Sequence, residues 1–165
     1  MRTRSQAADA SMAPVRGKVA VVASAFNRPV VEALVRGALA AIAASGAELV
    51  GPVWVAGALE LPLACQWVVE AAQPVAVVAL GCVIRGETRH FELVCDNAVA
   101  GLQQVSLALG VPVGQGVLAC ETLDQAMERS VEGSANSGYQ AAEAALGMAR
   151  LRPAVESTIG SVRRR

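Results

Sequence analysis

The sequence predicts an α/β fold: a three-layer sandwich with a central four-stranded parallel sheet and helices on both faces. Three observations support this prediction. Short apolar runs alternate four times with longer segments whose apolar residues recur at helical spacing. The run at 75–84 is apolar on both faces, as strands inside parallel sheets are. Glycine, proline or asparagine separates most of these segments, which marks turns and helix ends.

The strands and helices are expected in alternating order. The run 19–24 fits a buried first strand, and 49–55 a second, which tolerates Gly51-Pro52 only near a sheet edge or a bulge. The third and central strand is expected at 75–84 and the fourth at 113–120. The helices are expected between Asn27 and Gly46, at about 61–71, at 90–109, over a short stretch after Thr122, and at about 138–152.

Local signals place the helix ends. Asn27 is expected to cap the first helix, with Pro29 in its first turn, and Gly46 to end it. Thr122–Gln125 matches a capping box, and so does Ser137–Gln140 before the last helix. The other long helices are expected to end at Pro74, Gly110 and Pro153.

The length of 165 residues fits one domain. Residues 1–16 are polar and without periodicity, so we expect an N-terminal arm there. The α/β domain is expected at 17–153 and a flexible C-terminal tail at 154–165, which ends in three arginines.

The composition points to a subunit of a homo-oligomer. Apolar residues make up 54% of the chain but aromatic residues only 3%, and the mean hydropathy is +0.45. Such a chain is expected to cover apolar surface with partner subunits. A membrane protein is not favoured, because the apolar runs fall short of the ~20 residues that a spanning helix needs.

Charge and cysteine usage exclude further classes. The 14 basic residues balance the 14 acidic ones and form no stripe, so nucleic-acid binding is not expected. The four cysteines are widely spaced within apolar segments, which indicates reduced core residues in a cytoplasmic protein and no metal site. The segment 19–25 resembles a secretory signal only superficially, since it is short and fits the first strand.

The ends of the predicted strands gather the candidate functional residues. Ligands of parallel α/β sheets bind outside the carboxyl ends of the strands. Phe26 lies at the first end, where it could stack on a planar ligand or plug the core. Glu60 follows the second end, where it could accept from ligand hydroxyls or place charge at a helix N-terminus. Arg129 could bind a ligand or be solvated.

His90, the only histidine, opens the helix that follows the third strand. A buried strand, a polar glycine turn and a helix N-terminus form an anion site, since unpaired amides face the turn. A histidine there can exchange protons near neutral pH. A surface histidine at a helix start is the alternative, and the position of His90 at a strand end favours a functional role.

Several segments together resemble the lumazine synthase family, which has a flavodoxin-like fold. Ala25-Phe26-Asn27 is similar to its first strand end, and Gly57–Pro62 to its Gly-Ala-x-Glu-x-Pro turn. Ala79–Glu92 is very close to its signature stretch. Gly116–Leu118 and Thr122–Arg129 are similar to its fourth strand and following helix.

The resemblance covers residues 18–152 in one register. It implies condensation of 5-amino-6-ribitylaminouracil with 3,4-dihydroxy-2-butanone 4-phosphate to 6,7-dimethyl-8-ribityllumazine, phosphate and water, without a cofactor. It also implies pentamers, some assembled into sixty-subunit shells, with sites shared between neighbours.

The resemblance further implies roles for individual residues. His90 would move protons during imine formation and phosphate elimination. Phe26 would stack on the pyrimidine, Glu60 would accept from ribityl hydroxyls, and Arg129 would pair with the phosphate. Other residues would bind the substrates through backbone or side chain: Asn27, Ala58, Leu59, Cys82, Val83, Ile84, Gly86, Glu87, Thr88, Gln115 and Ser137.

The chain departs from the family pattern on the side that a neighbour would contribute. Gln115 stands where an aromatic residue is usual, Ser137 where a lysine is usual, and Ser130-Val131 where Ala-Gly is usual. An active enzyme remains the favoured hypothesis. The alternatives are a paralogue that binds flavin or lumazine or forms a shell without catalysis, and the related archaeal-type riboflavin synthase.

Overall fold

The structure, a computed structural model, describes residues 13–162 and the side chains of residues 13–159. Its strands are β1 (Lys18–Ser24), β2 (Glu48–Val55), β3 (Ala76–Ile84) and β4 (Val113–Cys120). Its helices are α2 (Arg28–Ser45), the 3-10 helix η1 (Ala58–Glu60), α3 (Leu61–Ala72), α4 (His90–Leu109), α5 (Leu123–Glu128) and α6 (Ser137–Val162). All four strands are parallel, in the order β2-β1-β3-β4, so the predicted fold class is confirmed.

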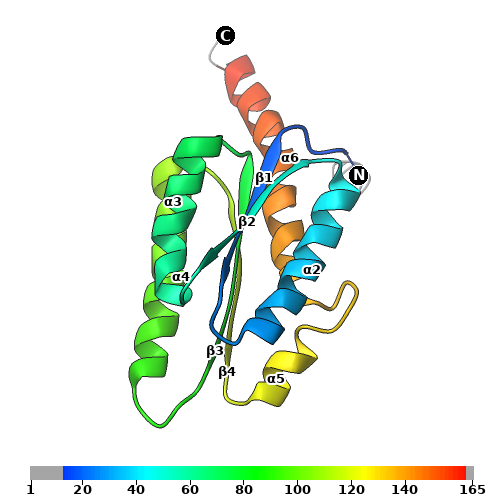
Figure 1. Cartoon of the computed structure of the whole chain (residues 1–165). Helices are drawn as coiled ribbons and strands as arrows, with labels where there is room; N and C mark the ends of the chain where they lie inside the picture. Colours follow the sequence, from blue (N-terminus) through cyan, green and yellow to red (C-terminus); the bar gives the residue numbers. More distant parts are fainter. Residues whose placement is uncertain (1–12, 163–165) are drawn as a thin grey trace, which may run out of the picture.

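The sheet is the middle layer of three. Helices α3 and α4 cover one face, and α2 and α6 cover the other, with α5 at the end of β4 (Figure 1). Alternate residues of β1 point to opposite faces: Val19 and Val21 pack toward α2 and α6, and Ala20 and Val22 toward α3. The core is built from alanine, valine and leucine, as the aromatic-poor composition requires.

Strand β2 is an edge strand and contains the predicted irregularity. The Gly51–Pro52 peptide is cis, and the register between β1 and β2 shifts between Ala20 and Val22. Proline lacks the N–H that a regular ladder needs, so an edge strand with a shift accommodates it. The expectation of an edge or a bulge is confirmed.

Helix α2 begins after Asn27 and ends at Gly46, as predicted, but the side chain of its N-cap residue bonds elsewhere. Gly46 adopts the left-handed conformation, with φ of 76°, that ends a helix. Asn27 also adopts this conformation, with φ of 53°, and its side chain makes no capping hydrogen bond. Asn27 is thus the N-cap residue, as predicted, but its side chain does not cap the helix, because its amide instead donates to the carbonyl oxygen of Cys82, 2.8 Å away.

The start of α6 is capped by Asn136 rather than by the Ser137 box. The Asn136 Oδ1 atom accepts from the backbone N–H groups of Gly138 and Tyr139, at 2.8 and 3.2 Å. Its amide nitrogen donates to carbonyl oxygens of Ala33 and Val131. The buried side chain of Asn136 thus supplies both an acceptor and a donor at the start of the helix. The prediction of a Ser137 cap is therefore wrong.

Helix α6 continues past Pro153 to Val162, so the prediction that Pro153 ends it is wrong. Proline removes one backbone donor, but the helix continues through this position. Arg152 pairs with Glu156 at 2.9 Å across the proline, and Arg152 also donates to the carbonyl oxygen of Gly110. Nine of the residues predicted as a loose tail, 154–162, are thus helical, and 163–165 lie outside the described residues.

The N-terminal arm was expected at 1–16, and its residues 1–12 lie outside the described part of the chain. Val15 is buried, and its N–H donates to the carbonyl oxygen of Ser45. Between residues 13 and 162, no helix has the length and apolar character needed to cross a membrane.

Candidate active site at the carboxyl edge of the sheet

A cleft of about 450 Å³ opens where β1, β2 and β3 end. Parallel strands bring their carboxyl ends to one edge, so residues far apart in sequence meet there. The predicted residues of these three strand ends line the cleft: Phe26, Asn27, Ala58, Leu59, Glu60, Cys82, Val83, Ile84 and His90. The structure therefore brings together most of the residues predicted to bind the pyrimidine and to move protons.

Phe26 presents its ring to solvent at the mouth of this cleft. Its side chain is 74% exposed, so the alternative of a core plug is wrong. Backbone hydrogen bonds tie the segment to the end of β2: the N–H of Ala25 donates to Val55 and that of Phe26 to Ala56. An exposed ring on a tied backbone is available for stacking on a planar ligand.

Asn27 fixes the end of β1 to the end of β3. Its amide donates to the Cys82 carbonyl, so the cleft is bounded by two strand ends held at a set separation. The predicted substrate-binding residues Asn27 and Cys82 are thus also partners of each other.

Glu60 closes the turn that follows β2. Its Oε2 atom accepts from the backbone N–H of Gly57 at 2.8 Å, and the side chain is otherwise exposed at the cleft. Both roles expected of Glu60 therefore have support, since its carboxylate places negative charge at the start of η1 and also lines the cleft in which a ligand would bind.

His90 is the first residue of α4, as predicted, and it lines the cleft. Gly86, Glu87 and Thr88 form the exposed turn that leads into it, beside the cleft rather than in its wall. The His90 N–H lies 3.4 Å from the Thr88 hydroxyl oxygen. A polar turn before a helix N-terminus offers amides to an anion, and His90 stands between this turn and the cleft.

Three predicted site residues, Gln115, Arg129 and Ser137, do not line the first cleft. Gln115 and Ser137 line a separate cleft of about 300 Å³ between β4 and α6. Arg129 lines neither cleft, and its guanidinium donates to the Gln125 carbonyl at 2.9 Å. Its own carbonyl accepts from the Ser137 N–H at 2.8 Å, so Arg129 and Ser137 are neighbours. One chain alone does not unite these residues with the first cleft.

The predicted capping box at Thr122 is half confirmed. The Thr122 hydroxyl accepts from the Gln125 N–H at 3.3 Å, but the Gln125 side chain accepts from the N–H of Glu121 instead of Thr122. This cap orients α5, and Arg129 is the C-cap residue of that helix.

Sequence reasoning missed three residues of the cleft wall: Ala56, Gly57 and Val94. Val94 lies four residues after His90, and residues four apart share a helix face, so this spacing was the available signal.

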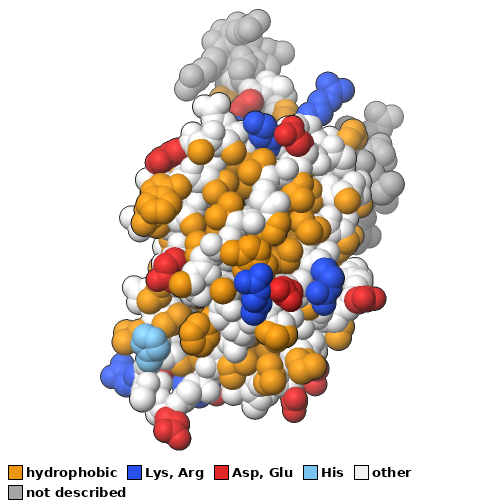
Figure 2. Space-filling view, viewed as in Figure 1, with side chains coloured by type: hydrophobic (Ala, Val, Ile, Leu, Met, Phe, Trp, Pro, Cys, Tyr) orange, Lys and Arg blue, Asp and Glu red, His pale blue; other side chains and the backbone are white. Residues whose placement is uncertain are grey.

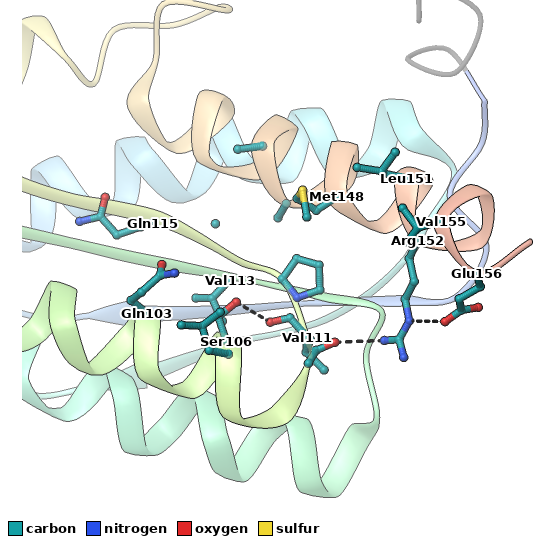
Figure 3. A pocket seen from close by; sticks show the side chains of 16 residues that line it. Gln103, Ser106, Val111, Val113, Gln115, Met148, Leu151, Arg152, Val155 and Glu156 are labelled. Carbon is teal, nitrogen blue, oxygen red and sulfur yellow. Dashed lines mark hydrogen bonds and ion pairs between the residues drawn. The ribbon is translucent and has the colours of Figure 1, made fainter. Parts of the chain in front are cut away.

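Another groove, of about 630 Å³, runs between the end of α4, β4 and α6 (Figure 3). Gln115 lies at one end and the Arg152–Glu156 pair at the other, with apolar side chains such as Met148 and Leu151 between them. The open edge of β4 is thus bordered by apolar surface.

Comparisons with known proteins identify the family of the chain. The family model described as 6,7-dimethyl-8-ribityllumazine synthase matches residues 16–153. A protein of that name from Azorhizobium caulinodans is 43% identical over 91% of this chain and 95% of its own length. One from Xanthomonas campestris pv. campestris is 39% identical over 87% of this chain and 94% of its own. The chain therefore belongs to the 6,7-dimethyl-8-ribityllumazine synthase family.

Proposed function

We propose that this protein is an active transferase of riboflavin biosynthesis. It condenses 5-amino-6-ribitylaminouracil with 3,4-dihydroxy-2-butanone 4-phosphate and releases 6,7-dimethyl-8-ribityllumazine, phosphate and water. The observation that carries the proposal is the convergence of Phe26, Glu60 and His90 on one cleft, in a chain of this family.

The cleft suits the ribityl-pyrimidine. The exposed ring of Phe26 offers a stacking surface, and the strand ends at Val83 and Ile84 offer backbone donors and acceptors for the edges of the heterocycle. Glu60 is placed to accept from sugar hydroxyls. Apolar walls with a few polar groups are typical of small-molecule sites.

The turn before α4 suits the phosphate of the second substrate. Gly86 lies in open space, and the amides of the turn precede a helix N-terminus, which favours an anion. His90 then lies between the phosphate and the pyrimidine, where it moves protons as the imine forms and phosphate leaves. Holding both substrates together supplies much of the rate acceleration.

We further propose that the complete site forms between two copies of the chain in a cytoplasmic homopentamer or a multiple of it. Arg129, Ser137 and Gln115 lie on the β4 side, away from the cleft, so a neighbour has to present them. Hydrophobic side chains spread over the face on which β2 and α3 lie (Figure 2). The exposed apolar residues of these two elements include Leu49 on β2 and Leu63 and Trp67 on α3. The groove along β4 is a second apolar surface.

A product assay tests the activity. Purified protein is incubated with both substrates, and lumazine absorbance and phosphate release are followed, with His90→Ala as the comparison. We expect product from the unaltered chain and on the order of 10²–10⁴-fold slower turnover from the variant. An unchanged rate in His90→Ala would contradict the proton-transfer role.

The same assay separates the alternative functions. Gln115 and Ser137, which replace the usual aromatic residue and lysine, favour a binder or shell component as the second candidate. That candidate predicts binding of the ribityl-pyrimidine without product. An archaeal-type riboflavin synthase would instead make riboflavin from lumazine alone.

Subunit complementation tests the shared site. His90→Ala lies on the cleft side and Arg129→Ala on the β4 side, so each homo-oligomer would lack one part of every site. Co-expressed chains would form some sites with both parts intact, and activity would exceed that of a mixture of separately made variants. Equal activity of the two preparations would place the site within one chain.

A further inference from the structure

Arg85 is the first residue after β3, and contacts within the chain occupy its side chain. Its Nε atom pairs with the Glu121 carboxylate at 2.6 Å, and its Nη1 atom pairs with Glu92. The guanidinium also lies 4.3 Å from the centroid of the Phe91 ring. Its backbone N–H donates to the carbonyl oxygen of Cys120.

These contacts span the turn that leads to His90. Arg85 precedes the turn, while Phe91 and Glu92 belong to the first turn of α4, which follows it. Glu121 lies in the loop between β4 and α5. One planar guanidinium thus joins three segments: the end of β3, the start of α4 and the loop after β4. Its fork of donors can serve two carboxylates at once.

Arg85, Glu92 and Glu121 form a network of ion pairs that is largely exposed to solvent. The side chains of Arg85, Glu92 and Glu121 are 36%, 44% and 57% exposed, and ion pairs in water add little to folding stability. Geometry, however, is fixed wherever several bonds hold one rigid group. The network therefore serves the placement of the turn more than the stability of the fold.

Direct phosphate binding by Arg85 is disfavoured. Two carboxylates already pair with its Nε and Nη1 atoms, so these donors are not free to bind an anion. The Phe91 ring covers one face of the guanidinium.

We infer that Arg85 is a positioning residue that holds the Gly86–Arg89 turn and the first turn of α4, so that His90 and the turn amides keep their places beside the cleft. The part of this inference that concerns turnover rests on the proposed function. The part that concerns His90 does not.

The test uses Arg85→Lys and Arg85→Gln, with Arg152→Lys as the matched control. Lysine keeps the charge but loses the fork that spans two carboxylates. Arg152 resembles Arg85, because it pairs with a glutamate and donates to a distant carbonyl, yet it lies on α6 away from the cleft. Each protein is assayed for kcat, for KM of both substrates and for thermal unfolding.

We expect kcat to fall roughly tenfold in Arg85→Lys and on the order of a hundredfold in Arg85→Gln, since small misplacements of catalytic groups cost that much. KM for the ribityl-pyrimidine should stay within about twofold, because its wall residues are untouched, and unfolding should match that of Arg152→Lys. Equal kcat in Arg85→Gln and the unaltered chain would overturn the inference. A tenfold rise in KM for the phosphorylated substrate with unchanged kcat would instead make Arg85 a phosphate ligand.

A second readout needs no turnover. The chain has one histidine, so labelling histidine with ¹³C at Cε1 gives a single NMR signal that reports on His90. We expect this signal to shift or broaden in both Arg85 variants and to stay in place in Arg152→Lys. An unmoved signal in Arg85→Gln would overturn the inference. A moved signal with no product from the unaltered chain would support positioning by Arg85 and refute the proposed activity.

Discussion

The Asn27 side chain donates a 2.8 Å hydrogen bond to the carbonyl oxygen of Cys82, a residue 55 positions later in the chain. The bond joins the ends of β1 and β3, between which the cleft opens. Asn27 also holds a left-handed backbone conformation that few side chains tolerate. One residue thus sets both the direction of the chain after β1 and the separation of two strand ends.

Replacement of Asn27 should therefore destabilise the fold. In Asn27→Ala, we expect a loss of about 2 kcal/mol in the free energy of unfolding, from the hydrogen bond and the unfavourable backbone conformation together. Urea denaturation measures it. Asn27→Gly restores the backbone freedom and should recover about half of the loss. Asn97→Ala, which removes an exposed bond to the Leu93 carbonyl, is the control and should change little.

Loss of the Phe26 ring should weaken substrate binding without weakening the fold. The ring is 74% exposed, so Phe26→Ala should leave thermal unfolding unchanged. Stacking on a heterocycle contributes about 1–3 kcal/mol, so KM for the ribityl-pyrimidine should rise on the order of tenfold or more. Ile159→Ala removes an exposed apolar side chain that lines none of the clefts and controls for general effects. An unchanged KM would argue against stacking.

A cation at position 137 should strengthen binding of the phosphorylated substrate. Ser137 neighbours Arg129 through a 2.8 Å backbone hydrogen bond, and both lie on the side that we assign to the neighbouring subunit. A hydrogen bond to a charged group is worth about 1.5–3 kcal/mol, so Ser137→Lys should lower KM for the butanone phosphate about tenfold or more. Steady-state kinetics with each substrate varied in turn would reveal it. An equal effect on both substrates would contradict contact with the phosphate.

Acid should dissociate the Arg85–Glu92 contact. The Arg85 side chain lowers the pKa of the Glu92 carboxyl below its ordinary value of 4.5. Because the carboxylate is favoured in the folded state, its contribution to stability is complete above the ordinary pKa and disappears as the pH falls through the lowered one. The difference in unfolding free energy between the unaltered chain and Glu92→Gln should follow this course. Glu156→Gln, in an exposed pair on α6, provides the comparison.

Local chemistry made much of the fold predictable. Gly46 and Gly110 ended their helices as expected, since a glycine that adopts positive φ needs no distant partner. The apolar runs located all four strands to within about one residue. The cleft was also predictable from local sequence. Phe26, Glu60 and His90 each follow the end of a strand, and the carboxyl ends of parallel strands lie at one edge of the sheet.

The wrong predictions concern residues whose partners are distant in sequence. Asn27 bonds to Cys82 rather than to its own helix, and Asn136 caps α6 while donating to Ala33, 103 positions away. Pro153 stays inside α6, where Arg152 bridges to Glu156 and to Gly110. Arg85 gained its role from Glu121, which no local pattern connects to it. Such contacts are properties of the tertiary structure.

The burial of the four cysteines bears on how the protein can be handled and how it tolerates oxidants. Burial raises the pKa of the Cys65 thiol to about 12 and that of Cys82 to about 11, and it also raises those of Cys95 and Cys120. Thiolates are the species that alkylating agents and peroxides attack, so burial disfavours reaction of these thiols while the chain is folded. The rate of reaction with a thiol reagent would therefore report how often the folded chain opens locally and exposes a cysteine.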